Sequence, residues 1–212
     1  MRWSVFDLIG PVMIGPSSSH TSGAASLGLY VNKIVGGVPD EVKIYLYGSF
    51  SQVYKGHGTD RALIGGLLGY KSDDSRLIES FHNADLKRMK YEIIPTGEDH
   101  HLHPNTVLFK VRRGSTNFEI VGCSIGGGNI EIHQINGVKI KPLDGKKDVF
   151  AIISDTKKDV SRLLNRLSCK YSSIDEYKTL NDKYLYLVHE IKSNSKGIAL
   201  PGYKYRLISS IL

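Results

Sequence analysis

Nine residues near the start of the chain, 15–23, have the sequence GPSSSHTSG and constrain its fold and chemistry more than any other segment. Pro16 restricts the approach of the backbone, and either Ser19 or Thr21 can cap a helix that we expect at residues 23–31. Free amide groups at such a helix start favour a carboxylate or a phosphate. An ordinary hydroxyl cap explains the same residues without a ligand, so an anion site here is a hypothesis.

Two histidines give this region possible acid–base chemistry. His20 lies inside the run, and an imidazole with a pKa near ~6.5 exchanges protons at neutral pH. His57 lies between two glycines, which let the backbone approach a ligand closely. Thr59 or Asp60 can cap the helix that follows. Asp60 could instead orient one of the two imidazoles, although the cap is the simpler interpretation.

A polar loop contains three histidines within residues 100–103, HHLH. Adjacent histidines in an extended loop point in different directions, and no carboxylate or cysteine has the matching spacing, so we interpret the cluster as a solvated loop and expect no metal. His103 differs, because Pro104 restricts its backbone and Asn105 supplies a donor and an acceptor. This pair suits the recognition of an amino acid.

Apolar periodicity predicts an α+β fold, with helices on a mixed or antiparallel sheet. We expect the strand at residues 91–94 to stop at Pro95, residues 48–51 to be loop, and residues 124–129, SIGGGN, to turn between strands rather than bind an anion. The other expected strands lie at residues 42–46, 106–112, 118–123 and from 130, and the other helices at residues 61–68 and about 73–84.

A second domain is predicted after residues 141–148, KPLDGKKD, whose composition is that of a linker. We therefore divide the chain into residues 1–145 and 146–212. A strand at 149–153, a helix at 159–167 and a strand at 184–191 fit a β-α-β-β-α-β order. This order predicts a ferredoxin-like, four-stranded antiparallel sheet with two helices.

Residues 4–21, SVFDLIGPVMIGPSSSHT, closely resemble the opening of the beta chain of iron-sulfur-dependent L-serine dehydratase. The likeness continues through residues 56–60 (GHGTD), 103–106 (HPNT) and 124–130 (SIGGGNI), and so covers the first two-thirds of the chain.

The second domain resembles an ACT domain, a small amino-acid-sensing module. The usual ACT ligand turn carries an Asp and a Pro-Gly pair, whereas residues 154–159 are SDTKKD. A structural role or self-association through this domain is therefore at least as well supported as effector binding.

The resemblance implies a lyase that converts L-serine to pyruvate and ammonia together with a cysteine-bearing alpha subunit. In the family, that subunit carries a [4Fe-4S] cluster whose iron binds the serine hydroxyl, so no pyridoxal phosphate is needed. This chain has only Cys123 and Cys169, too few for a four-iron cluster, so the partner must hold it. The hypothetical roles are His57 as the base for the Cα proton, His20 as proton donor or hydroxyl partner, and His103 with Asn105 holding the carboxylate. The implied substrate-binding residues are Ser17, Ser18, Ser19, Thr21, Thr59 and Asn105.

Composition bears on the other classes of function. The net charge of +7 comes from scattered lysines and arginines with no basic stripe interleaved with aromatics, so we expect no nucleic-acid partner. No stretch approaches the ~18 apolar residues of a membrane span and no apolar signal follows residues 1–4, so we expect no membrane association and a cytoplasmic location. The alternative is a regulatory serine-binding module without turnover, since a similar beta domain paired with an ACT domain regulates some phosphoglycerate dehydrogenases.

Overall fold

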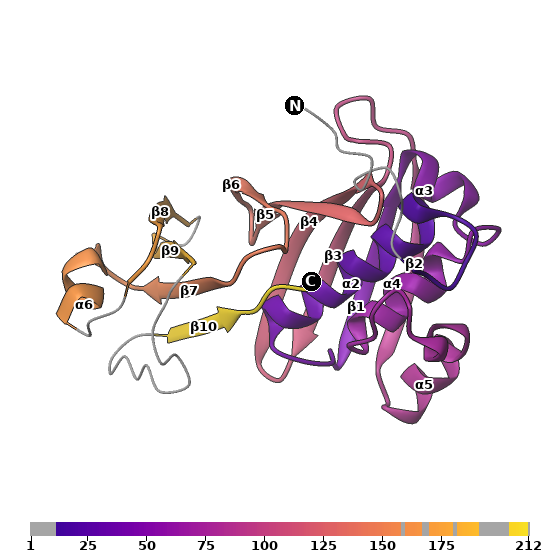
Figure 1. Ribbon diagram of the computed structural model, residues 1–212, viewed down its shortest axis with the longest axis horizontal. Helices are drawn as coiled ribbons and strands as arrows, with labels where there is room; N and C mark the ends of the chain where they lie inside the picture. The colour runs from indigo at the N-terminus through magenta and orange to yellow at the C-terminus, as the bar shows by residue number, and fades with distance from the viewer. Residues whose placement is uncertain (1–11, 158–159, 167–169, 180–181, 191–203, 212) are drawn as a thin grey trace. The chain divides into compact units, whose positions relative to one another are not determined.

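The computed structural model describes residues 12–157, 160–166, 170–179, 182–190 and 204–211 (Figure 1). The chain forms two compact units, Met1–Ile135 with Lys139–Asp144, and Asn136–Val138 with Gly145–Leu212. Among the described helices, none combines the length and the apolar character that crossing a membrane would require.

The first unit is built on a six-stranded mixed sheet, in the order β2-β1-β3-β4-β5-β6. β1 pairs parallel with β2 and antiparallel with β3, and the β3–β4 and β4–β5 pairs are antiparallel. The expected mixed sheet is therefore confirmed. The strands are β1 (Glu41–Tyr47), β2 (Lys90–Gly97), β3 (Thr106–Arg113), β4 (Thr116–Gly126), β5 (Asn129–Ile135) and β6 (Val138–Leu143).

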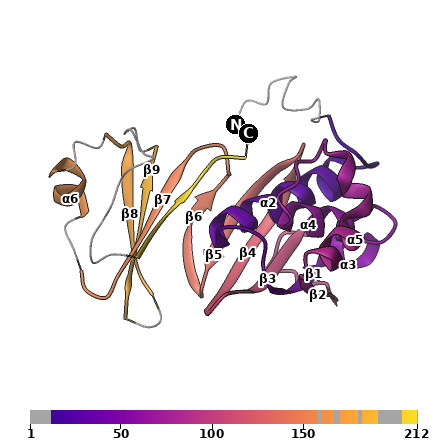
Figure 2. The same ribbon diagram turned by 90° about the horizontal axis from the view of Figure 1, so that it is seen from below.

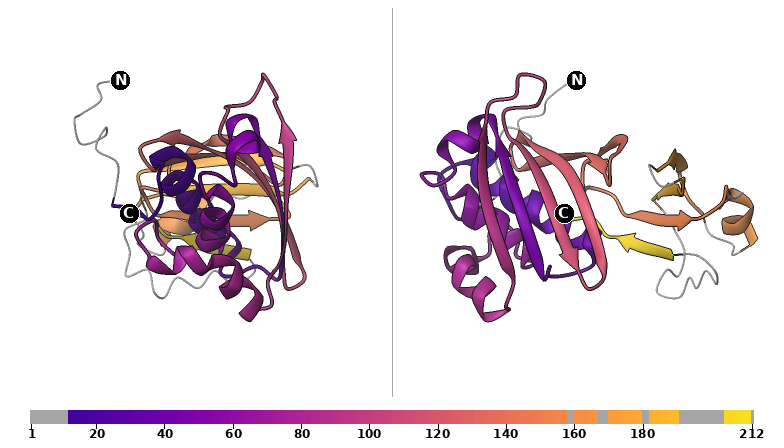
Figure 3. Two further views of the ribbon diagram at one scale, coloured as in Figure 1. Left: turned by 90° about the vertical axis from the view of Figure 1, so that its right-hand side faces the viewer. Right: turned by 180° about the vertical axis from the view of Figure 1, so that it is seen from behind.

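Helices cover one face of this sheet, as Figures 2 and 3 show. α2 (Gly23–Val35) packs on β4 and β5, and also on α4 (Thr59–Leu67). The backbones of these two helices touch, because a Cβ atom at Gly28 would overlap the Leu63 carbonyl and one at Gly66 would overlap the Ala25 carbonyl. The helix expected at residues 23–31 is therefore present, and its Gly28 lies on the face that α4 covers.

The short helices follow the sequence in part. The expected helix at residues 73–84 is present, as a 3₁₀ turn, η2 (Ser75–Glu79), that leads into α5 (Ser80–Leu86). The Asp74 side chain caps η2 by accepting a hydrogen bond from the Arg76 backbone. The expected turn within residues 124–129 is present at Gly127 and Gly128, between β4 and β5, and Gly126, Gly127 and Gly128 have φ values of 96°, 60° and 79°. Those values lie in the region that glycine tolerates best.

Three local predictions were wrong. Residues 48–51 are not loop, because they begin α3 (Gly48–Val53), whose Phe50 side chain is fully buried. β2 does not stop at Pro95, because β2 is an edge strand and a proline can direct its missing N–H away from the sheet there. The predicted linker overlaps β6, which runs to the buried Leu143.

The second unit is a four-stranded antiparallel sheet with the order β10-β7-β9-β8. Its elements are β7 (Val149–Ser154), α6 (Val160–Arg166), β8 (Ser173–Lys178), β9 (Tyr184–His189) and β10 (Lys204–Ile208). α6 buries Val160 and Leu164 against Phe150, Ile152, Tyr186 and Val188. The first and last strands are neighbours, which is the arrangement expected of a β-α-β-β-α-β fold. The second expected helix would precede β10 and lies outside the described residues.

Candidate functional site

The first helix start is capped by Ser17 rather than by Ser19 or Thr21. The Ser17 hydroxyl accepts a hydrogen bond from the His20 backbone N–H at 3.1 Å, and a π-helical turn, η1 (Ser18–Ser22), then leads into α2. The Ser18 carbonyl accepts a hydrogen bond from the N–H of Gly23 within this turn. The predicted cap was therefore in the correct segment but at the wrong residue, and the hydroxyls of Ser19 and Thr21 are left to bind the two histidines.

His20 is held between two hydroxyl groups. Its Nδ1 lies 2.9 Å from Ser19 Oγ, and its Nε2 lies 2.9 Å from Ser49 Oγ at the start of α3. Burial lowers the pKa of His20, and the neighbouring His57 lowers it further. His20 is therefore a neutral imidazole at pH 7, in which one nitrogen donates and the other accepts.

His57 lies on the turn that precedes α4, with its ring centroid 5.0 Å from that of His20. The Thr21 hydroxyl donates a hydrogen bond to the His57 carbonyl at 2.9 Å, which joins the two helix starts. Nδ1 of His57 lies 3.4 Å from the Val53 carbonyl, which can only accept a hydrogen bond. A hydrogen bond to this carbonyl requires the proton on Nδ1, and in that tautomer Nε2 carries the lone pair that a general base needs.

Both caps predicted for α4 were wrong. Gly58 is the N-cap, with a φ of 66°, and Thr59 and Asp60 lie inside the first turn. The Asp60 carboxylate accepts a hydrogen bond from the Arg61 backbone at 2.8 Å, so its described contact is with that amide rather than with an imidazole. Burial raises the pKa of Asp60.

Unpaired polar atoms gather around the starts of α2 and α4. Within the described part of the chain, the buried side-chain oxygens without a hydrogen-bond partner include those of Ser22, Thr59, Asn105 and Ser124. A Cβ atom at Gly23 would overlap the Ser124 hydroxyl, so these strand and helix residues face one another. Leaving such an atom unpaired costs ~1–3 kcal/mol, and a polar ligand would recover that free energy. These oxygens are therefore candidates for substrate binding.

The loop that contains His103 is attached to α3 beside Ser49. The Pro104 carbonyl accepts a hydrogen bond from the Phe50 backbone at 3.3 Å, and Gly48, with a φ of 54°, leaves room for Pro104. His103 itself is exposed, and its Nδ1 accepts a hydrogen bond from the Asn105 N–H at 3.1 Å. The structure therefore pairs the rings of His20 and His57, whereas the described contact of His103 lies within its own loop.

Asn105 reaches toward the sheet. Its Nδ2 donates a hydrogen bond to the Ser124 carbonyl at 3.4 Å, which leaves Oδ1 as the buried, unpaired atom. The free atom is an acceptor, and an acceptor binds an ammonium group better than a carboxylate.

A cavity of about 510 Å³ opens beside His57 and Thr21. Three charged side chains line it, Lys55, Asp60 and Arg61. Neither Lys55 nor Arg61, nor the His20 partner Ser49, is among the predicted site residues. Lys55 could have been recognised from the sequence, because it lies directly before the GHGTD segment.

The chain lacks the donor set for an iron–sulfur cluster. A four-iron cluster needs three or four thiolates, and the sequence has two cysteines. Cys123 is buried, and burial raises the pKa of its thiol to about 11, helped by the Glu131 carboxylate. Cys169 lies outside the described residues.

Comparison with known proteins identifies the family. The family model "Serine dehydratase beta chain" matches residues 4–90. The "Probable L-serine dehydratase, beta chain" of Bacillus subtilis (strain 168) is 42% identical over 159 residues, covering 73% of this chain and 69% of that protein. The "L-serine dehydratase, beta chain" of Peptoniphilus asaccharolyticus is 42% identical over 141 residues, covering 66% of this chain and 63% of that protein. The match to "L-serine dehydratase 2" of Escherichia coli (strain K12), 32% identical, covers 30% of that protein. On the length and identity of these matches, the chain belongs to the serine dehydratase beta chain family.

Proposed function

We propose that this chain is the beta subunit of a two-chain L-serine dehydratase, which deaminates L-serine to pyruvate and ammonia together with a [4Fe-4S]-bearing alpha subunit. The observation that carries the proposal is the pairing of His20 and His57 at 5.0 Å, with one ring neutral and the other presenting a free nitrogen. Two relatives are named as beta chains of L-serine dehydratase, which supports a separate alpha chain as the partner.

His57 is the base in this proposal. Its Nδ1 is occupied by the Val53 carbonyl, so Nε2 can take the proton from Cα of bound serine. Gly56 and Gly58 leave the ring at the wall of the cavity, and a Cβ atom at Gly58 would meet nothing within 4 Å. A substrate that enters the cavity would therefore contact His57.

His20 acts beside it as a proton donor or hydroxyl partner. Because its ring is neutral at pH 7, it can both give and accept a proton through the hydroxyls of Ser19 and Ser49.

The unpaired oxygens suggest how the amino acid is held. We assign Asn105 Oδ1 to the α-ammonium group, because it is an acceptor whose amide nitrogen is already used. The hydroxyls of Thr59 and Ser124 can donate hydrogen bonds to the α-carboxylate. The role of His103 in binding the substrate carboxylate rests on the resemblance alone, and His103 is exposed.

The cluster and the departure of the serine hydroxyl belong to the partner subunit, since two cysteines cannot hold four irons. We place the complex in the cytoplasm, where thiols stay reduced. We assign self-association, rather than effector binding, to the ACT-like second unit.

The deciding experiment is an anaerobic pull-down of the full chain, with iron content and pyruvate formation from L-serine measured with and without its partner. A brown complex with a cysteine-bearing second chain, active together and inactive apart, supports the proposal. If the chain purifies alone, binds serine and forms no pyruvate under any condition, the regulatory-module alternative holds and the catalytic roles fall.

A further inference from the structure

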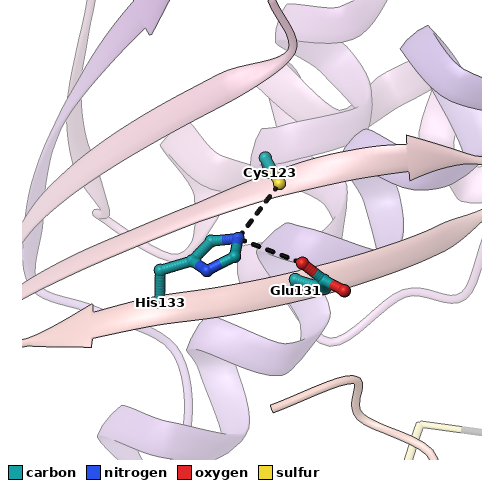
Figure 4. Close-up of side chains that lie close together, drawn as sticks. All are labelled: Cys123, Glu131 and His133. Atoms are coloured by element: carbon teal, nitrogen blue, oxygen red, sulfur yellow. Dashed lines mark hydrogen bonds and ion pairs between the residues drawn. The ribbon is translucent and has the colours of Figure 1, made fainter. Parts of the chain in front are cut away.

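Three side chains that this mechanism does not use converge across two neighbouring strands (Figure 4). Cys123 comes from β4, and Glu131 and His133 come from β5. His133 Nε2 lies 3.4 Å from Cys123 Sγ and 3.2 Å from Glu131 Oε2, and all three ligand atoms lie within 4.8 Å of one another. The group is partly sheltered, because Cys123 is buried and the other two side chains are 33–43% exposed.

The sheet explains how these side chains meet. A Cβ atom at Gly122 would lie 3.1 Å from Leu27 of α2, so Gly122 faces the helices and Cys123 faces the opposite side of the sheet. Cys123 pairs directly with Glu131 in the strand register. The register then shifts beside Gly122, so His133 is an extra residue in β5. Such a bulge re-aims a side chain, and here it brings His133 beside the other two.

A catalytic relay does not fit this arrangement. In a cysteine–histidine–acid relay, the imidazole uses one nitrogen for the thiol and the other for the carboxylate. Here the thiol and the carboxylate both approach Nε2, which can serve only one of them through its single proton. Three potential ligand atoms that lie around one point are instead typical of a metal-binding site.

Two of the three distances between the ligand atoms fit a tetrahedral ion. Zinc bonds of about 2.3 Å to sulfur, about 2.05 Å to nitrogen and about 2.1 Å to oxygen, at tetrahedral angles, separate sulfur from nitrogen by ~3.6 Å and nitrogen from oxygen by ~3.4 Å. The distances of 3.4 and 3.2 Å fall close to both values. One thiolate, one imidazole and one carboxylate are also the ligand types that zinc selects.

We propose that Cys123, Glu131 and His133 bind one zinc-type divalent cation across β4 and β5, with the fourth position open to water or to a further ligand. On binding, the metal–sulfur bond replaces the sulfur–hydrogen bond, and the thiol proton passes to the solvent. The site would link the two strands on the face that the helices leave free.

Titration of the full, chelator-treated chain with Co²⁺ under anaerobic conditions tests the site, because a cobalt–thiolate bond gives a charge-transfer absorption that requires sulfur. We expect one Co²⁺ per chain, displaced by Zn²⁺, and no charge-transfer band in Cys123→Ser. The matched control is Cys169→Ser, which should keep the band. A chain that gives no band, a band that survives in Cys123→Ser, or a band lost only in Cys169→Ser overturns the proposal.

Two further variants keep the test decisive if Cys123→Ser does not fold. Glu131→Gln and His133→Asn should each weaken Co²⁺ binding by at least about tenfold, since even outer partners of a metal site are worth about 10- to 100-fold. His82→Asn, an exposed histidine on α5, is the control and should bind as the unaltered chain does. Circular dichroism identifies the variants that are folded. Unchanged affinity in both ligand variants would also overturn the site.

Discussion

The imidazole rings of His20 and His57 lie with their centroids 5.0 Å apart and their planes tilted by 38°. One ring comes from the turn that leads into α2 and the other from the turn before α4. The Thr21 hydroxyl joins the two turns by its hydrogen bond to the His57 carbonyl. Burial lowers the pKa of His20, and the neighbouring His57 ring lowers it further.

Replacing His57 with alanine should remove turnover while leaving assembly with the partner intact. Loss of a general base lowers kcat by about 10²- to 10⁴-fold. Pyruvate formation by the reconstituted complex measures the effect, and iron content and gel filtration measure assembly. His82→Asn changes an exposed histidine on α5 and should retain activity. Near-normal turnover in His57→Ala would show that another group takes the Cα proton.

Ser49 is predicted to act as a positioning residue for His20. Ser49→Ala removes the hydroxyl 2.9 Å from Nε2, and the loss of one hydrogen bond of ~0.5–1.5 kcal/mol corresponds to about 2- to 10-fold in kcat. The pH–rate profile should change as well, and Ser49→Thr should restore both. Ser115→Ala, in the exposed β3–β4 turn, is the matched control. A lower kcat with an unchanged pH profile would point to a packing role alone.

The lowered pKa of His20 predicts an acid-sensitive fold. The unfolded chain takes up this proton at a pH of about 6.5, whereas the folded chain resists it, so stabilisation present above that pH is lost as pH falls through the lower folded-state pKa. Urea unfolding at about pH 7.5 and about pH 5.5 measures the loss. His20→Gln cannot take up the proton and should lose less stability over this interval. An equal loss in both proteins would contradict the prediction.

Gly28→Ala should destabilise the first unit. The added methyl group would overlap the Leu63 carbonyl of α4, and overpacking of this kind costs ~1–3 kcal/mol in the free energy of unfolding. Gly56→Ala is the control, since its Cβ atom would have the Val53 carbonyl, at 3.8 Å, as its nearest neighbour. Urea denaturation compares the two. If Gly28→Ala is as stable as the unaltered protein, the helices have room to move apart.

The sequence predicted the elements better than their boundaries. Alternation at Val42, Ile44 and Leu46 correctly marked β1, because these side chains are fully buried on one face. Pro95 misled the boundary of β2, since a proline is excluded from a central strand but not from an edge strand, and strand order cannot be derived from local pattern.

Of the site residues, the sequence predicted only those that a local pattern marks. The GPSSSHT and GHGTD segments marked His20 and His57, because glycines and hydroxyls around an imidazole are a local signal. Ser49 carried no such signal, since its role depends on α3 lying beside η1, which only the folded chain establishes. The unpaired Oδ1 of Asn105 likewise could be identified only in the folded chain, where Asn105 Nδ2 donates a hydrogen bond to the Ser124 carbonyl.

The contact between Gly28 and Gly66 brings the backbones of α2 and α4 together without intervening side chains. Each of these helices begins next to one of the two imidazoles, so this contact also fixes how far apart the acid–base groups stand. A larger residue at either glycine would push the two helices apart and so widen that spacing. Such a protein could fold and keep every reactive atom, yet hold its two histidines too far apart to act on one substrate molecule.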